Sequence, residues 1–218
     1  MYFIAIILVL WSQRKVKGAY EHFSKIPVES HISGAQVARS ILDSQGLTNV
    51  SVEISQKGLL SDHFDPKTNN VYLSPKVYND DSVASVAIAA HEVGHAIQYA
   101  EHYGMVGVRN AILPAAIVSG YIGWIVLIIG LVSNIQMLSI VGFMMVTVIA
   151  VFQLITLPIE FNASSRALKL LTSDNYISVD EGADAKAMLS AAALTYVVAL
   201  LATLLQIARF ALLNNRRR

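Results

Sequence analysis

Two long stretches without a charged residue most constrain what this 218-residue chain can fold into. They cover residues 111–132 and 135–157, and only Ser133 and Asn134 separate them. As a helix rising about 1.5 Å per residue, each stretch is long enough to cross about 30 Å of hydrocarbon. The sequence therefore predicts a tight transmembrane helical hairpin, and the chain must leave the bilayer on the side from which it entered.

The overall composition agrees with a membrane protein. Charged residues make up 14% of the chain and hydrophobic residues 55%, whereas roughly a quarter of the residues in a soluble domain are charged. The net charge of +1 gives no indication of a nucleic-acid surface. Cysteine is absent, which excludes disulfides and thiolate metal sites, so any metal must be held by histidine and carboxylate.

The N-terminal run from Tyr2 to Trp11 is apolar, and basic residues follow it rather than precede it. This order favours a membrane anchor over a cleaved signal peptide. Because the run is shorter than the roughly 20 residues of a full span, a helix lying in the interface is the alternative. The expected organisation is an anchor at 1–18, a mixed polar portion at 19–110, the hairpin at 111–157, a helix and connector at 158–188, and a transmembrane helix with a basic tail at 189–218.

Local patterns predict the elements of the mixed polar portion. The fold class expected from them is mainly α, a multi-pass helical membrane bundle with a small α+β portion. Turn and capping residues mark where these elements begin and end. The expected elements are a helix at 33–46 stopped by Gly46, a strand at 49–55, an irregular segment from 59 with a turn at 65–70, a strand at Val71–Leu73, and a helix from about Ser82 to Glu101.

The last of these helices contains "AAHEVGHAIQ" (89–98), in which His91 and His95 are four residues apart. Residues at this spacing share one helix face, so both imidazoles can bind a single ion. Glu92 is offset by about 100° and can reach a water on that ion without being a ligand. Zinc lowers the pKa of such a water toward 7, and a carboxylate accepts its proton as it attacks a carbonyl. The pattern predicts metal-assisted amide hydrolysis with Glu92 as the catalytic base; two histidines that bind nothing are the alternative.

A catalytic zinc ion needs a third protein ligand and one open position. Just past the hairpin, "LPIEFNASSRALKLL" supplies Glu160 as the first charged residue, and Pro158 suits the first turn of a helix there. Because the hairpin returns to its starting side, Glu160 is the expected third ligand. The alternative is a carboxylate that the dipole of a helix N-terminus favours.

Six motifs are distributed over nearly the whole chain: "IPVES", "GAQVARSILDSQGL", "LSDHFDPKTNNVYLSPKVYN", "SVAIAAHEVGHAIQ", "LPIEFNASSRAL" and "AAALTYV". Together they resemble the YugP-type bacterial membrane zinc metallopeptidases, which are distantly similar to HtpX-type proteases. The resemblance implies a gluzincin-like site, with His91, His95 and Glu160 on Zn²⁺, Glu92 as general base, and a zincin-like catalytic portion at 19–110. HtpX-like proteases usually carry an aspartate four residues after the ligand glutamate, where this chain has Ser164.

Three further side chains and one strand are auxiliary candidates. His63 can stabilise an oxyanion or close the cleft, or it is an ordinary loop histidine. Tyr196 can face the site as a hydrogen-bond donor, or it packs between helices. Arg166 can pair with a carboxylate in the site, or it is a solvated charge. The strand Val71–Leu73 can be the sheet edge that pairs with an extended substrate, or an ordinary strand.

The sequence therefore predicts a membrane-embedded zinc endopeptidase that cleaves peptide bonds at the membrane surface. Its expected partners are polypeptide substrates, membrane proteins among them, and the lipid bilayer. The alternative is a membrane scaffold or partner-binding protein that retains a structural zinc site. A transporter is disfavoured because 111–132 and 135–157 contain no ionisable residue that would mark a permeation path.

Basic residues beside the membrane segments place the active site on the cytoplasmic face of the cell membrane, according to the positive-inside rule. The three arginines at 216–218 argue for the opposite side if residues 189–208 span the bilayer completely. The residues that favour the cytoplasmic face are Arg14, Lys15, Lys17 and Arg109.

Overall fold

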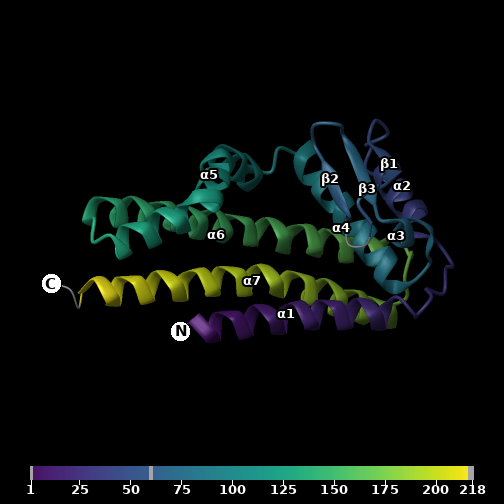
Figure 1. Cartoon of the computed structure of the whole chain (residues 1–218). Helices are drawn as coiled ribbons and strands as arrows, with labels where there is room; N and C mark the ends of the chain where they lie inside the picture. The colour runs from purple at the N-terminus through teal and green to yellow at the C-terminus, as the bar shows by residue number, and fades with distance from the viewer. Residues whose placement is uncertain (1, 59–60, 216–218) are drawn as a thin grey trace. The chain divides into compact units, whose positions relative to one another are not determined.

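The computed structural model describes residues 2–58 and 61–215, and helices dominate this part of the chain (Figure 1). The expected mainly α fold with a small α+β portion is confirmed. The arginines at 216–218 and residues 59–60, where the expected irregular segment begins, lie outside the described residues. In chain order the elements are α1 (Tyr2–Phe23), α2 (Gly34–Ser44), β1 (Ser51–Ile54), β2 (His63–Asp65), β3 (Asn70–Leu73), α3 (Pro75–Asn79), α4 (Val83–Ala100), α5 (Gly104–Val132), α6 (Gln136–Ser173) and α7 (Val179–Asn215).

The chain folds into two compact units. We call Met1–Gln13, Gly104–Ile159 and Leu194–Arg218 the helical unit, and Arg14–Tyr103 with Glu160–Ala193 the mixed unit. Helices α1, α6 and α7 each contribute residues to both units. Glu160 is therefore the first residue of α6 that belongs to the mixed unit, which also contains the whole of α4.

The helical unit contains the predicted hairpin, formed by α5 and the first part of α6. The connection turns at Asn134, which adopts a left-handed φ of 59°, and the Ile135 N–H donates to the carbonyl of Gly130 at 3.0 Å. Among the described helices, α5, α6 and α7 are long and apolar enough to cross a membrane. Helix α1 instead continues from its apolar first half into basic residues, so its role as an anchor stays a prediction.

The expectation that Pro158 begins a new helix is wrong. Helix α6 runs without interruption from Gln136 to Ser173, and Pro158 lies inside it. Proline lacks the N–H that would bond the carbonyl four residues earlier, but apolar membrane helices tolerate it when neighbouring groups compensate. Glu160 is consequently in a helix interior, and the dipole of a helix N-terminus does not explain its presence.

Two further expectations about the mixed unit are corrected by its three-stranded sheet, whose order is β1-β3-β2. β3 is the central strand, parallel to β1 and antiparallel to β2, so Val71–Leu73 is not a sheet edge. Residues His63–Asp65, expected to be irregular, form β2 and pair with Asn70–Tyr72. The turn between β2 and β3 is closed by Asn69 at a φ of 56°, a conformation that asparagine tolerates better than most residues.

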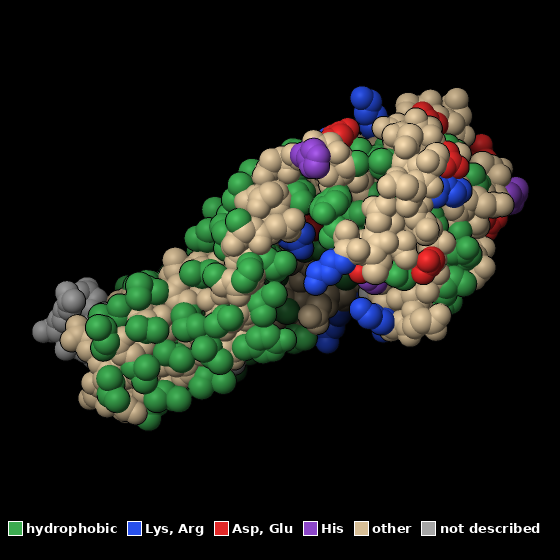
Figure 2. All heavy atoms as spheres, turned by 90° about the horizontal axis from the view of Figure 1, so that it is seen from above, with side chains coloured by type: hydrophobic (Ala, Val, Ile, Leu, Met, Phe, Trp, Pro, Cys, Tyr) green, Lys and Arg blue, Asp and Glu red, His purple; other side chains and the backbone are tan. Residues whose placement is uncertain are grey.

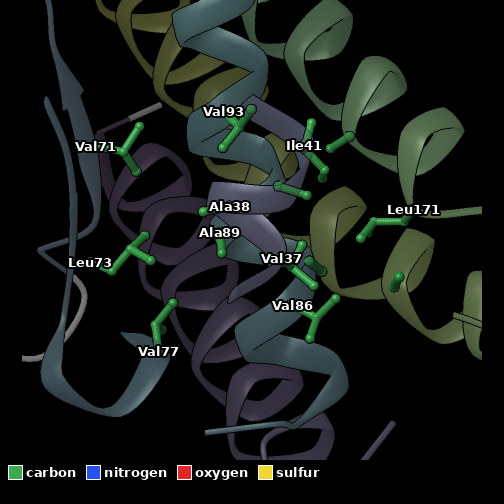
Figure 3. Packing of buried hydrophobic residues seen from close by; sticks show 14 of the residues in the cluster. Val37, Ala38, Ile41, Val71, Leu73, Val77, Val86, Ala89, Val93 and Leu171 are labelled. Carbon is green, nitrogen blue, oxygen red and sulfur yellow. The ribbon is translucent and has the colours of Figure 1, made fainter. Parts of the chain in front are cut away.

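Helices α2 and α4 form as expected, because each has a serine N-cap. The Ser33 side chain accepts from the backbone of Gln36, whose own side chain bonds back to Ser33. Ser82 accepts from the backbone of Ser85. The faces of these helices and of β3 meet in one apolar core, to which the end of α6 adds Leu171 (Figure 3). The core therefore holds α4 against the part of α6 that carries Glu160.

The surface of the helical unit is apolar, whereas the charged side chains gather on the mixed unit (Figure 2). The buried cluster of the helical unit is small and centres on Leu127, Val146 and Phe210. Large apolar side chains such as Tyr121 and Met137 are instead exposed. A helix that is hydrophobic all round suits a lipid environment, so this surface agrees with membrane association.

Candidate metal centre

Helix α4 brings His91 and His95 together, one helical turn apart on the same face. Their ring centroids are 4.7 Å apart and their planes meet at 85°. The helix is rich in alanine and most of its residues are buried, so both imidazoles extend from a rigid, well-packed backbone. The predicted arrangement of the two side chains on one helix face is therefore present.

The carboxylate of Glu160 in α6 approaches both rings. Its Oε2 lies 3.4 Å from Nε2 of His91 and 3.6 Å from Nε2 of His95. These distances exceed the usual length of a hydrogen bond, which is about 2.7–3.2 Å. A tetrahedral zinc ion with bonds of about 2.0–2.1 Å separates its ligand atoms by about 3.4 Å. The spacing thus fits a shared ion better than direct hydrogen bonds.

Glu160 also has the burial expected of a metal ligand. The residue is 7% exposed, and its Oε2 is buried without a hydrogen-bond partner. A buried carboxylate oxygen without a partner costs free energy unless a cation compensates it. Among the described residues, His91, His95 and Glu160 are the group whose ligand atoms all lie within 4.8 Å of one another. These residues therefore fit a divalent metal ion.

The other nitrogen of each imidazole has a partner of its own. Nδ1 of His91 lies 3.1 Å from the Ser164 hydroxyl, and Nδ1 of His95 lies 3.0 Å from Oε1 of Gln98. A metal-bound histidine commonly donates its second N–H to such an acceptor, which orients the ring. Both rings thus turn Nε2 toward Glu160 and Nδ1 toward a hydrogen-bond partner.

The electrostatics of this cluster also favour a cation. Burial by itself would lower the pKa of His95, but the carboxylates of Glu160 and Glu92 outweigh it and raise that pKa above its ordinary value. The carboxylates therefore make the surroundings of the imidazole negative enough to attract a positive charge. A divalent ion at Nε2 would satisfy the same carboxylates in place of a proton.

Glu92 lies beside the cluster, and a strand of the sheet holds its side chain. Its side chain is largely buried, and Oε2 accepts a hydrogen bond from the backbone N–H of Phe64 at 3.1 Å. Phe64 is the middle residue of β2, opposite Val71 of β3. The strand that the sequence patterns did not predict is thus the element that positions this carboxylate.

Gly94 lets α4 approach α6 closely. A Cβ atom at this position would lie 2.8 Å from the carbonyl oxygen of Ala163 and 3.2 Å from its Cα. Ala163 follows Glu160 by one helical turn. The absence of a side chain at Gly94 therefore allows the short distance between the histidines and the carboxylate.

Comparison with known proteins agrees with this geometry. A family model described as "Putative neutral zinc metallopeptidase" matches residues 1–215. The chain is also 41% identical over 214 residues to the "Putative membrane protease YugP" of Bacillus subtilis (strain 168), which covers 97% of this chain and 95% of that protein. No solved structure matches.

The chain belongs to this family of zinc metallopeptidases. The sequence resemblance stated above is thereby confirmed. A zinc peptidase requires a set of nitrogen and oxygen ligands when cysteine is absent. The group His91, His95 and Glu160 is the set of described residues in this family member that can provide it.

Two of the auxiliary side chains of this metallopeptidase have partners other than the three candidate ligands. The His63 ring stacks on Tyr72 with centroids 5.1 Å apart, and its Nδ1 contacts the carbonyl of Ser61 at 2.7 Å. Arg166 forms an ion pair with Glu101 at 2.7 Å, and Glu101 is not one of the candidate site residues. Tyr196 belongs to the helical unit, so its predicted role stays a prediction.

The sequence patterns predicted none of three contacts: Phe64 with Glu92, Gln98 with His95, and Ser164 with His91. To predict the Phe64 contact, one must first recognise β2. The turn signal at 65–70 of this metallopeptidase implies a hairpin, and a hairpin needs a strand before the turn as well as after it. Gln98 follows His95 by three residues on the same helix face, and that spacing predicts contact.

Proposed function

We propose that the protein is a membrane-embedded zinc endopeptidase whose ion is held by His91, His95 and Glu160. The observation that carries this proposal is the convergence of two Nε2 atoms and one buried carboxylate oxygen at the spacing of a tetrahedral ion. When bound, zinc polarises a substrate carbonyl and makes a water molecule acidic near neutral pH. An open fourth position for that chemistry is the difference between a catalytic and a structural zinc site.

In this proposal Glu92 is the general base. It follows His91 directly, so it lies beside the ligand face of α4 without being on it. Its Oε2 is held by the N–H of Phe64, which leaves the other oxygen to take the proton of the attacking water. The same carboxylic acid then donates that proton to the nitrogen of the leaving amine.

The edge of β2 suits an extended polypeptide substrate. β2 pairs with β3 along one side, and among the described strands none pairs with its other side. The Phe64 N–H points away from β3, because it donates to Glu92 instead of to the ladder. In an antiparallel strand the carbonyl of the same residue points the same way, and it can accept from a substrate N–H beside the general base.

The position of Glu160 supports cleavage at the membrane surface. It follows the uncharged stretch 135–157 by three residues and is the first charged residue of α6. We therefore propose that membrane proteins and their juxtamembrane segments are substrates. Basic residues at 14–17 and Arg109 support a site on the cytoplasmic side of a multi-pass cell-membrane protein.

The test is zinc content together with cleavage of a casein-like substrate by the detergent-solubilised full chain. Glu160→Ala should lose the stoichiometric zinc ion and all cleavage. Glu92→Gln should retain zinc and lose cleavage by about 10²-fold or more, because general-base catalysis contributes about 10²–10⁴-fold. Glu53→Gln makes the same chemical change on the exposed face of β1 and should leave both unchanged.

Two results would reject parts of this proposal. Full activity of Glu92→Gln would reject the base assignment. Stoichiometric zinc in a wild-type protein that cleaves no polypeptide would favour the scaffold with a structural zinc site.

Replacing Phe64 by proline tests the strand that holds Glu92. Proline removes the N–H that Glu92 accepts, and an edge strand tolerates it where the N–H points outward. Phe64→Ala keeps this N–H and is the matched control. Phe64→Pro should bind zinc yet lose more activity than Phe64→Ala, and equal activities would reject the role of the backbone N–H.

A further inference from the structure

A chain of hydrogen bonds leads from His95, on the side away from Glu160, to Arg166. His95 Nδ1 lies 3.0 Å from Gln98 Oε1, and Gln98 Nε2 donates to Asn162 Oδ1 at 2.9 Å. Arg166 Nε donates to the same Asn162 oxygen at 2.8 Å. Gln98 is fully buried, although glutamine is a residue type that is usually exposed. A buried polar side chain at this position calls for a specific explanation.

The donors and acceptors in this series of hydrogen bonds can be arranged in only one direction, and Arg166 sets that direction. A guanidinium has donors and no acceptor, so the atom of Asn162 that faces Arg166 must be its oxygen. Gln98 must then turn its NH₂ group to that oxygen and its carbonyl oxygen to His95. His95 must in turn carry its proton on Nδ1, because an amide oxygen can only accept. Its Nε2 lone pair is thereby left for an ion.

We propose that Gln98, Asn162 and Arg166 are positioning residues that fix the metal-binding tautomer of His95. This inference rests on the proposed zinc site. It assigns a role to Arg166, which touches none of the three candidate ligands, and it explains why a buried glutamine follows the second histidine by three residues. The ion pair from Arg166 Nη2 to Glu101 Oε2 holds the guanidinium in place at the surface.

His91 supplies an internal comparison. Its Nδ1 contacts the hydroxyl of Ser164, which can either donate or accept. This partner does not determine which nitrogen of His91 carries the proton. The two ligand histidines therefore differ: the tautomer of His95 is imposed by a directed chain, and that of His91 is not.

The same series of hydrogen bonds connects the helix that supplies both histidines to the helix that supplies Glu160. Gln98 lies on α4, and Asn162 and Arg166 lie on α6. Loss of these hydrogen bonds could therefore weaken zinc binding through helix packing alone. The test needs variants of similar size, which preserve packing while they change the hydrogen-bonding groups.

The experiment measures zinc affinity by competition with a chromophoric chelator and the d–d spectrum of the Co²⁺-loaded full chain in detergent. Asn162→Leu removes the acceptor and should weaken zinc binding by about 10–100-fold with an altered Co²⁺ spectrum. Asn162→Asp keeps an oxygen acceptor at the same place and should stay within about tenfold of the wild type with an unaltered spectrum. Thermal unfolding of each variant reports the effect on packing separately.

Changes at Arg166, whose side chain is 27% exposed, test whether its guanidinium sets the direction of these hydrogen bonds. Arg166→Met should weaken zinc binding as Asn162→Leu does, and Arg166→Lys, which keeps a donor, should restore most of it. Lys169→Met removes a positive charge from an exposed position of the same helix, leaves the Nε contact of Arg166 with Asn162 intact, and serves as the control.

Each outcome decides a different claim. A wild-type protein that binds no zinc overturns the proposed function, and this inference with it. If the wild type binds zinc and Asn162→Leu or Arg166→Met binds it equally well with the same Co²⁺ spectrum, this inference alone is overturned. Equal losses in Asn162→Asp and Asn162→Leu would also overturn it, because helix packing would then explain the effect.

Discussion

The two units of this protein differ in where their apolar side chains lie: those of the mixed unit are buried, and many of those of the helical unit are exposed. In the mixed unit, apolar residues of α2, α4, β3 and the end of α6 are fully buried in one core. In the helical unit, the most apolar 18-residue windows of α5 and α6 are only 28% and 22% buried. One chain therefore contains a part that excludes apolar groups from water and a part whose apolar surface needs a lipid environment.

This difference shows which chemistry each unit can support. The mixed unit has the rigid packing and the polar side chains that a metal centre requires, and all three candidate ligands belong to it. The helical unit has no charged residue in 111–132 and 135–157 and is suited to anchoring. The candidate site begins at Glu160, the residue with which α6 enters the mixed unit.

The largest expected difference in stability comes from replacing one leucine by alanine in each unit. Leu73→Ala empties a fully buried position in β3 and should destabilise the mixed unit by about 2–5 kcal/mol. Leu154→Ala changes a side chain of α6 that is 58% exposed, and its effect should stay within about 0.5 kcal/mol. Hydrogen exchange in detergent measures each effect in its own unit, in α4 for Leu73→Ala and in the part of α6 before Glu160 for Leu154→Ala. Equal effects would show that the two units do not differ in this way.

A charge placed on an exposed isoleucine of each unit sharpens the comparison. Ile129 in the helical unit and Ile54 in the mixed unit are 48% and 40% exposed. If the first faces lipid and the second faces water, Ile129→Lys should cost about 3 kcal/mol of membrane insertion and Ile54→Lys almost nothing. A membrane-integration assay of the two variants reports the difference. Normal integration of Ile129→Lys would show that this face is not in contact with lipid.

A smaller effect is expected where the mixed unit is packed most tightly. Gly94→Ala should force α4 away from the carbonyl of Ala163 at a cost of about 1–3 kcal/mol, as overpacking generally does. Because the histidines and Glu160 lie on these two helices, zinc affinity should fall by about tenfold or more. Gly18→Ala adds the same methyl group where nothing lies within 4 Å and is the control. Unchanged zinc affinity in Gly94→Ala would show that the site does not need this close approach.

Predictions that rest on short-range patterns agree with the structure. The spacing of His91 and His95, the helices expected at 33–46 and from about Ser82 to Glu101, and the hairpin at Asn134 all depend on residues near one another in sequence. The uncharged stretches predicted the apolar helices for the same reason, since about 20 apolar residues suffice to cross a bilayer. Their ends were less well predicted, because α6 continues through Pro158.

Strand order was not predictable in this way. Whether Val71–Leu73 is central or at an edge depends on its parallel pairing with β1 and its antiparallel pairing with β2. The β1–β3 pairing joins residues about 19 positions apart, and no local pattern encodes it. The contact between Phe64 and Glu92 depends on that order, so the sequence singled out Glu92 as the candidate base and missed the strand that holds it.

By itself, the sequence determined the zinc-peptidase pattern on α4, the apolar helices, and Glu160 as the first charge after the hairpin, because composition and helical periodicity are local properties. Only the tertiary structure decided that Glu160 reaches both imidazoles and that Asn162 and Arg166 extend the contacts of His95 through Gln98. The contacts of Glu160 with the imidazoles and of Gln98 with Asn162 join residues more than 60 positions apart, and packing of α4 against α6 brings them together.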